Sequence, residues 1–377
     1  MLARSSDSGS APRADLDDRS SYQCLDPVGM LDFAIHFPSQ LAEAAEIGRT
    51  FAALAELRAP RQIVLAGMGG SAVAGDFLVG LCEKRARVPF VVCRNYHIPA
   101  FVGPETLFIA SSHSGDTEET LAATSAALRR GADILCITTG GKLRQFAQRH
   151  REKSVRLLQI PRTYPSMPPR AALGYSLIPL VYALELVGAY PGAGRQVRES
   201  IALLARQRNQ LAPDVPTPQN PAKRLAKSLF GKIPWVQGTV GPMSAAAYRW
   251  RCQFNENSKT LAYSSEYPEL NHNEVVGWEL AERFAGLIEV VVLRSPDDYW
   301  RNRERVSITE HKLIGPKAPV HVIEAEGRSP LAQLMWVVYL GDFTSLYLAF
   351  LNGVDPAAMD SINILKAHLE GLRRPRK

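Results

Sequence analysis

The chain has 377 residues, of which 46% are hydrophobic and 21% are charged, and its formal net charge is +7. This length is enough for two domains of ordinary size, and this balance of residues excludes an intrinsically disordered chain. No aromatic-interleaved basic stripe, zinc-finger spacing or helix-turn-helix pattern accompanies the positive charge, so we expect an anionic substrate or a basic surface and no nucleic-acid partner.

The first half of the chain has the pattern of an α/β domain. Residues 1–22 are polar and lack the apolar core of a signal peptide, which predicts a disordered lead-in. An amphipathic helix is expected within 23–57. Short β-branched runs then alternate with helical patterns, which indicates right-handed βαβ units and a mainly parallel, doubly wound sheet in a domain over 23–206. The predicted strands are 62–66, 90–93, 107–111, 134–138 and 155–160.

The second half repeats this architecture without an alignable sequence repeat. Residues 207–223 are rich in Pro, Asn, Gln and Asp, which predicts a linker. In a second domain over 224–377, strands are expected at 233–237, 286–293 and 320–324, and helices near 244–260 and 299–313. The predicted fold class is therefore α/β, with two doubly wound subdomains, each a mainly parallel sheet flanked by helices.

Cysteines and apolar stretches indicate where the protein resides. The five cysteines are odd in number and widely spaced, which argues against a disulfide framework and fits a reducing cytoplasm. Two apolar stretches, 173–190 and 334–351, approach the length of a membrane span, but Pro179, Glu185 and Asp342 interrupt them. We expect buried helices, a cytoplasmic protein and no membrane partner.

Two turns rich in glycine and serine each follow an apolar strand-like run and open a helix-like one, namely Gly67-Met-Gly-Gly-Ser71 and Ser111-Ser-His-Ser-Gly-Asp-Thr117. Such turns direct backbone N–H groups and the positive end of a helix dipole outward, and hydroxyl groups add donors without charge. The second turn alone could be an ordinary helix cap. Together the turns predict a phosphate site, with candidate ligands Gly69, Gly70, Ser71, Ser112, Ser114 and Thr117.

The first turn also fits a dinucleotide-binding pattern, G-x-G-x-x-G/A, over Gly67–Ala72. The next predicted strand ends in Cys93-Arg-Asn95, where NAD binding prefers an acidic residue, although Arg94 would suit a 2′-phosphate. An NADP-dependent oxidoreductase is therefore one alternative function.

A GGS turn followed about forty residues later by SxSGxTxET resembles the sugar isomerase (SIS) domain, which binds phosphosugars. Three further motifs, Pro169-Arg170, Asn255-Glu-Asn-Ser-Lys259 and Asn271-His-Asn-Glu274, resemble the bifunctional phosphoglucose/phosphomannose isomerases, and the similarity extends over about 25–369. This resemblance implies interconversion of glucose 6-phosphate, and of mannose 6-phosphate, with fructose 6-phosphate through an enediolate. No cofactor is expected, and the histidine and cysteine spacings predict no metal site.

Glu256 and His272 are the candidate acid–base residues. Isomerisation needs one base to move a proton between C2 and C1, and Glu256, near the end of a predicted helix, fits that role unless it is merely a solvated helix residue. His272 lies in a polar turn and titrates in the range needed for ring opening. The resemblance implies that this histidine comes from the neighbouring subunit, so we expect a homodimer with His272 contributed across the interface.

Arg170 and Lys366 complete the predicted catalytic set. Arg170 precedes a long apolar helix, where an arginine is either exposed at the helix start or buried with an anion. The resemblance implies that it stabilises the enediolate. Lys366 resembles the family's lysine that assists ring opening; otherwise it would lie on a solvated helix face.

Three positions depart from the family pattern, namely Met359, Asp116 and His113, which stands where relatives often carry Tyr. Met359, with Ser361 nearby, stands where the family has a small hydroxyl residue linked to acceptance of mannose. Asp116 would repel a phosphate unless it turns away to cap a helix or to orient a donor.

A non-catalytic phosphosugar sensor with the same fold is the second alternative function.

Overall fold

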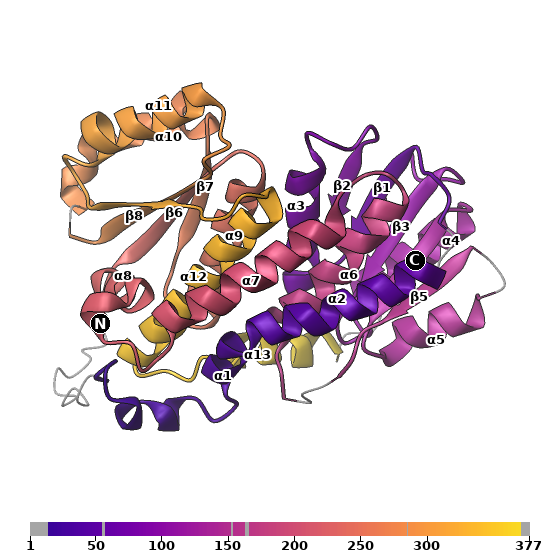
Figure 1. Ribbon diagram of the computed structural model, residues 1–377, viewed down its shortest axis with the longest axis horizontal. Helices are drawn as coiled ribbons and strands as arrows, with labels where there is room; N and C mark the ends of the chain where they lie inside the picture. Colours follow the sequence, from indigo (N-terminus) through magenta and orange to yellow (C-terminus); the bar gives the residue numbers. More distant parts are fainter. Residues whose placement is uncertain (1–13, 55–56, 152–153, 163–165, 285, 371–377) are drawn as a thin grey trace.

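The computed structural model describes residues 14–54, 57–151, 154–162, 166–284 and 286–370, which form two parallel sheets joined by helices (Figure 1). The first sheet has the strand order β2-β1-β3-β4-β5, and every neighbouring pair is parallel. Its strands are β1 (Gln62–Ala66), β2 (Phe90–Cys93), β3 (Thr106–Ser111), β4 (Asp133–Thr138) and β5 (Val155–Gln159).

The second sheet is also parallel and has the order β7-β6-β8-β9. Its strands are β6 (Ile233–Thr239), β7 (Tyr263–Tyr267), β8 (Ile288–Arg294) and β9 (Val320–Glu324). Both orders contain a 2-1-3-4 pattern, as expected for doubly wound α/β sheets, so the predicted fold class is confirmed. Strand β7 was not predicted, because this edge strand is Tyr-Ser-Ser-Glu-Tyr and lacks an apolar face.

Helices between the sheets make a common core. One apolar cluster includes Leu65 and Ile109 from the first sheet and Val236 and Val291 from the second, together with helices α2, α6, α7, α9 and α12. Figure 1 shows these helices between the two sheets. The helices are α1 (Met30–Ile35), α2 (Phe37–Leu54), α3 (Gly69–Cys82), α4 (Glu118–Arg129), α5 (Gly141–Arg149), α6 (Leu173–Leu186), α7 (Ala193–Leu211), α8 (Pro221–Leu229), α9 (Pro242–Glu256), α10 (Glu274–Gly277), α11 (Trp300–Ile308), α12 (Pro330–Leu351) and α13 (Asp360–Glu370).

Helix α12 is the most apolar long element. It is long and apolar enough to cross a membrane, but 94% of its most apolar window is buried inside the fold, as is typical of a core helix. Helix α6 is likewise almost entirely buried. Both apolar stretches therefore form buried helices, as the sequence predicted.

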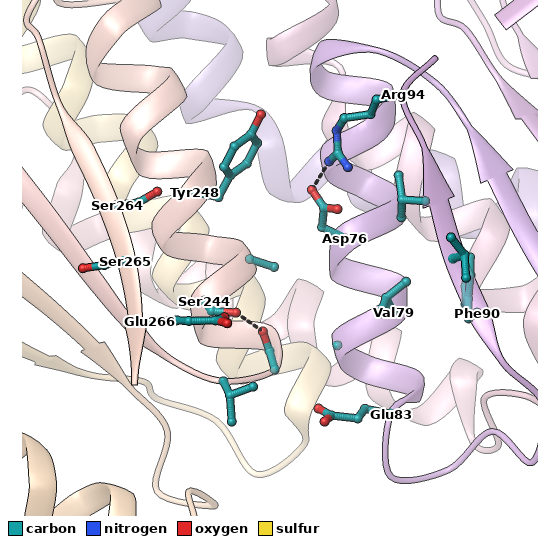
Figure 2. Close-up of a pocket in the computed structure, with 16 residues that line it drawn as sticks. Asp76, Val79, Glu83, Phe90, Arg94, Ser244, Tyr248, Ser264, Ser265 and Glu266 are labelled. Carbon is teal, nitrogen blue, oxygen red and sulfur yellow. Dashed lines mark hydrogen bonds and ion pairs between the residues drawn. The ribbon is translucent and has the colours of Figure 1, made fainter. Parts of the chain in front are cut away.

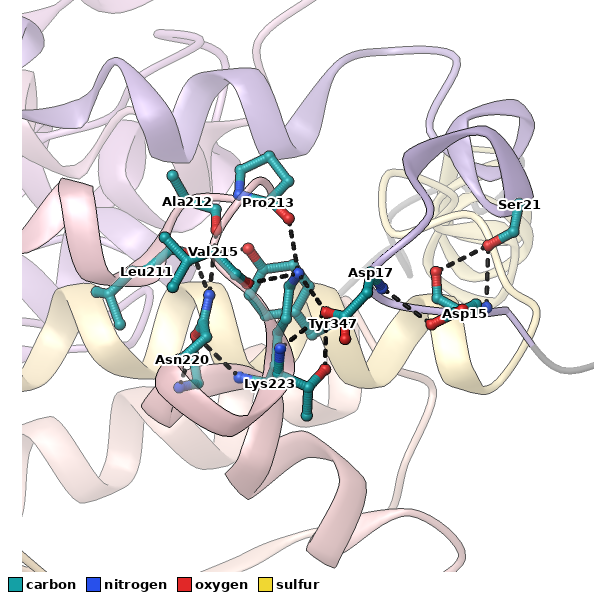
Figure 3. A network of polar contacts seen from close by, with 12 residues as sticks. Asp15, Asp17, Ser21, Leu211, Ala212, Pro213, Val215, Asn220, Lys223 and Tyr347 are labelled. Carbon is teal, nitrogen blue, oxygen red and sulfur yellow. Dashed lines mark hydrogen bonds and ion pairs between the residues drawn. The ribbon is translucent and has the colours of Figure 1, made fainter.

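The N-terminal segment 14–22 differs from the disordered lead-in that the sequence predicted, while residues 1–13 lie outside the described residues. Leu16 and Tyr22 are buried, and the Tyr22 ring stacks on Phe350 with 4.6 Å between centroids. The buried Lys223 ammonium donates to Asp17 Oδ1 at 3.0 Å (Figure 3). These apolar and ionic contacts fix 14–22 against the second half of the chain.

Within the predicted linker, 207–223, the irregular part is shorter than expected. Helix α7 continues to Leu211 and α8 begins at Pro221, so only 212–220 connect them, with one 3-10 turn at Thr217–Gln219. Lys223 also donates to the carbonyls of Pro213 and Val215 (Figure 3), which orders this connection. The division into domains at this point stays a prediction.

Candidate functional site

The two glycine- and serine-rich turns lie side by side at the carboxyl edge of the first sheet. Strands β1 and β3 are paired, with Ala66 opposite Ala110, and each turn follows directly. A Cβ atom on Gly67 would lie 3.0 Å from the Ser111 carbonyl oxygen, so the turns are in close contact. The chain leaves β1 toward β2 on one side and leaves β3 toward β4 on the other side, and ligands of such sheets bind at this topological switch point.

Side chains within the second turn fix its shape. Ser112 Oγ lies 2.9 Å from Thr117 Oγ1 and accepts the Gly115 N–H at 3.0 Å. Ser114 is exposed, and its Oγ accepts the Asp116 N–H at 3.2 Å. Asp116 Oδ1 in turn accepts the Lys142 N–H at 3.1 Å, at the first turn of α5. Asp116 therefore turns away to a neighbouring helix, as an anion site requires.

The first turn contacts the segment that carries Arg170. This segment is a 3-10 turn at Pro169–Ala171. A Cβ atom on Gly70 would lie 3.3 Å from the Pro169 carbonyl oxygen and 3.5 Å from Arg170 Cα. The absence of a side chain at Gly70 lets the two turns approach, which places Arg170 next to the predicted phosphate ligands.

The Arg170 side chain is 5% exposed and is bound along most of its guanidinium. Nε donates to Asn257 Oδ1 at 2.7 Å, and Nη2 donates to the carbonyls of Pro356 and Ala357. Nη1 lies 3.6 Å from Glu256 Oε2, an ion pair without a hydrogen bond. Burial lowers the pKa of Arg170, and the Glu256 carboxylate acts in the opposite direction. Nη1 is thus the part of this fixed cation that faces the candidate base.

Helix α12 holds Arg170 indirectly, through residues of α9 and of the position that follows it. Arg249 Nη2 donates to the Arg170 carbonyl at 3.1 Å and to both Asp342 carboxylate oxygens, at 3.0 and 2.9 Å. Asn257 Nδ2, beside the base, donates to Ser345 Oγ at 2.9 Å. None of these three residues, Arg249, Asn257 and Asp342, was predicted to belong to the site. The available signal was Asp342 itself, because a carboxylate within an apolar helix requires a buried partner.

Two predicted catalytic residues, His272 and Lys366, do not contact Glu256 within one chain. Helix α9 has 15 residues, so it is about 22 Å long and runs from the carboxyl edge of β6 to the amino edge of β7, where Glu256 lies. His272 follows β7 and therefore lies at the opposite edge, exposed to solvent. Lys366 is also exposed, on α13. Among the described residues, no hydrogen bond or ion pair joins His272 or Lys366 to Glu256.

The switch point of the second sheet is different, because a carboxylate occupies it. Thr239 Oγ1, at the end of β6, donates to Asp298 Oδ1 at 2.8 Å, and the Ser295 N–H donates to Asp298 Oδ2 at 2.9 Å. Burial raises the pKa of Asp298, and these hydrogen bonds act in the opposite direction. An internal carboxylate here takes up donors that an anionic ligand would need. At this switch point, among the described residues, Asp298 thus occupies donors that the first half leaves to its two turns.

Figure 2 shows a cavity of about 770 Å³ between the two halves, lined by α3, β2, α9 and β7. None of the predicted site residues lines it. Arg94, which could have held the 2′-phosphate of NADP, is paired there with Asp76 and lies 5.7 Å from the Tyr248 ring centroid. The Asp76 carboxylate thus neutralises the arginine that would have bound the 2′-phosphate.

Among the described residues, no group of three or more His, Cys, Asp or Glu side chains is placed to hold a metal ion. All five cysteines are free thiols.

Comparisons with known proteins agree on one family. Residues 56–151 match the SIS domain, and 218–369 match the bacterial phospho-glucose isomerase C-terminal SIS domain. A bifunctional phosphoglucose/phosphomannose isomerase of Caldicellulosiruptor bescii is 39% identical over 91% of this chain and 100% of its own length. One from Thermoplasma acidophilum is 34% identical over 81% of this chain and 89% of its own.

A solved structure shows the same fold. A glucose-6-phosphate isomerase like protein from Thermus thermophilus has a TM-score of 0.56 and 21% identity, over 94% of this chain and 99% of that one.

Proposed function

Because this chain belongs to the bifunctional phosphoglucose/phosphomannose isomerase family, we propose that it interconverts glucose 6-phosphate and mannose 6-phosphate with fructose 6-phosphate, and that Glu256 is the base. The observation that carries the proposal is the approach of the Arg170 guanidinium to Glu256 beside the first phosphate turn. A carboxylate, a fixed cation and an anion-binding turn are the groups that enediolate chemistry needs.

In this proposal the two turns bind the phosphate. Gly69, Gly70 and Ser71 lie in the first turn of α3, and Thr117 immediately precedes α4, so both helix dipoles point toward the site. Ser112, Ser114 and the backbone N–H groups add donors. Binding at this place puts the sugar carbons toward Arg170, because Gly70 is packed against that segment.

Glu256 then removes the proton from C2 of the open aldose and returns it to C1. The electrons of the broken C2–H bond form the C1–C2 double bond, and the former carbonyl oxygen on C1 becomes anionic. The proton of the C2 hydroxyl then moves to that oxygen, and C2 becomes the ketone as the double-bond electrons take the proton back from Glu256 at C1. Arg170 Nη1, which lies beside the base without a hydrogen bond to it, stabilises this oxyanion. Glucose 6-phosphate and mannose 6-phosphate differ at C2 only, so one enediol and one base serve both.

We assign ring opening to His272 from a second copy of the chain. The two edges of the second sheet separate His272 from Glu256 of its own chain. Three apolar side chains that follow His272, namely Val276, Leu280 and Phe284, are 59%, 63% and 56% exposed, and such patches mark interfaces. A homodimer would cover them and supply the histidine to the partner's site.

Lys366 is a second candidate for ring opening. Its helix, α13, starts shortly after the carbonyls of Pro356 and Ala357, which Arg170 binds. Lys366 is six positions after Asp360, about 9 Å along the helix. The start of α13 is thus close in sequence to the segment that Arg170 binds.

The complete proposal is a cytoplasmic isomerase that needs neither a metal ion nor a cofactor.

Proton NMR of the EDTA-treated protein with fructose 6-phosphate in D₂O tests this function. We expect the anomeric signals of glucose 6-phosphate and mannose 6-phosphate, with deuterium at C2. Glucose 6-phosphate alone would limit the substrate range and direct attention to Met359. Saturable binding without either product would overturn the proposal in favour of a phosphosugar sensor.

A further inference from the structure

Lys259 has an unusual backbone conformation. Its φ is +54°, and among the described residues it alone combines a positive φ with a side chain. The left-handed region is unfavourable for residues with a Cβ, and Asn or Gly is the usual occupant after a helix. Strain of this kind persists where the surrounding contacts determine the conformation, and it is frequent at functional sites.

The contacts that hold Lys259 are made by its ammonium group. Nζ donates to the Glu256 carbonyl at 2.7 Å and to the Asp355 carbonyl at 2.8 Å, and it has a longer contact of 3.5 Å with the Asn257 carbonyl. The first and third carbonyls belong to the end of α9 and to the residue after it. The second belongs to the connection between α12 and α13. Lys259 thus joins the backbone of the candidate base to a distant segment.

Arg170 binds the next two carbonyls of that segment. Three successive carbonyls, those of Asp355, Pro356 and Ala357, therefore accept hydrogen bonds from two neighbouring cations. Lys259 is exposed overall, but partial burial of its ammonium group lowers its pKa, and the positive charge of Arg170 acts in the same direction. Both cations are bound to carbonyls of one segment, and the Glu256 carboxylate lies 3.6 Å from Arg170 Nη1.

We propose that Lys259 is a positioning residue for the isomerase reaction: its ammonium group ties the Glu256 backbone to segment 355–357 and so fixes Glu256 relative to Arg170. The proposal rests on the proposed role of Glu256. A simple helix cap would need no ammonium group, because glycine adopts this conformation without strain. The lysine side chain is therefore what the site uses.

Lys259→Gly tests the proposal, because it relieves the backbone and removes the ammonium group. We expect kcat about 10- to 100-fold lower with KM changed less than about threefold, since a small displacement of the base affects chemistry more than phosphate binding. Ethylammonium should restore part of the lost kcat, and Lys259→Arg should keep more activity than Lys259→Gly. Lys227→Ala, an exposed lysine on α8, is the control and should behave as the unmodified protein.

Hydrogen–deuterium exchange gives a readout that does not depend on turnover. Lys259→Gly should speed exchange at the amides of 357–359, and Lys259→Asn, which tolerates the left-handed conformation, should do the same if the glycine variant does not fold. Unchanged kcat and unchanged exchange would overturn the proposal. If the unmodified protein turns over no sugar phosphate, the proposed function fails, and exchange alone decides whether Lys259 fixes segment 355–357.

Discussion

Arg170 Nη1 lies 3.6 Å from Glu256 Oε2, too far for a hydrogen bond and near enough for strong attraction. The remaining nitrogens of this guanidinium are bound to Asn257 and to backbone carbonyls, so Nη1 cannot swing toward Glu256 without breaking those bonds. A substrate oxygen could therefore bind Nη1 while the carboxylate stays available to carbon-bound protons.

Glu256→Gln removes the proposed base and keeps nearly the same shape. We expect kcat about 10²–10⁴-fold lower, because a general base contributes about that factor, with saturable sugar-phosphate binding retained. Steady-state rates together with titration calorimetry check both parts. Glu304→Gln on α11, an exposed residue, is the matched control. A loss of less than about tenfold in Glu256→Gln would make the base assignment wrong.

Arg170→Lys keeps the positive charge but removes the planar donor set. One ammonium group cannot bind Asn257, the carbonyls of segment 355–357 and a substrate oxygen at the same time. We expect kcat to fall about 10²–10³-fold, as on loss of an oxyanion donor, and KM to change less. Arg206→Lys, at an exposed position of α7, should leave both constants unchanged. Equal activity of the two variants would contradict the role of Arg170.

Much of the fold could be predicted because its signals are local. Strands β1 and β3 are apolar runs that end in turns of glycine and serine, and both the strands and the turns lie where the pattern placed them. Strand β7 was missed because it is polar and lies at the edge of its sheet. Its position is determined by pairing with β6, which a single sequence does not display.

The support of the site could not be predicted for a related reason. Arg170 and Asn257 are 87 residues apart in sequence, and Arg249 and Asp342 are 93 apart. The first pair forms only when the 3-10 turn 169–171 packs against the end of α9, and the second only when α9 packs against α12. Polar residues in apolar helices indicate that partners exist, but their identity depends on tertiary packing.

Asp342→Asn should reduce stability as well as activity. Arg249 is almost completely buried, and this change would leave its charge without a carboxylate, which typically costs about 3–5 kcal/mol. The free energy of unfolding in urea measures this loss. Glu46→Gln, which breaks an exposed pair with Arg49, should give no measurable change. If Asp342→Asn kept its stability but had a lower kcat, the ion pair of Arg249 with Asp342 would instead serve only to hold Arg249 against the Arg170 carbonyl.

Gly70→Ala tests the close approach of the two turns. Its Cβ would lie 3.3 Å from the Pro169 carbonyl oxygen, so the phosphate turn and the Arg170 segment must move apart by a few tenths of an ångström. We expect a several-fold higher KM with little change in melting temperature, because alanine favours the helix that starts here. Gly103→Ala, whose Cβ has only one atom as near as 4.0 Å, is the control. An unchanged KM would show that this packing does not shape the phosphate site.

Mixing two inactive variants tests whether His272 acts across a homodimer. In a heterodimer of Glu256→Gln and His272→Ala, one site carries both changes and the other carries neither. Random exchange of subunits makes half of the dimers heterodimers, so we expect about one quarter of the unmodified specific activity. Each variant alone should remain nearly inactive under the same exchange conditions. If Glu256 and His272 acted within one chain, every site in the mixture would lack one of them, and mixing would restore nothing.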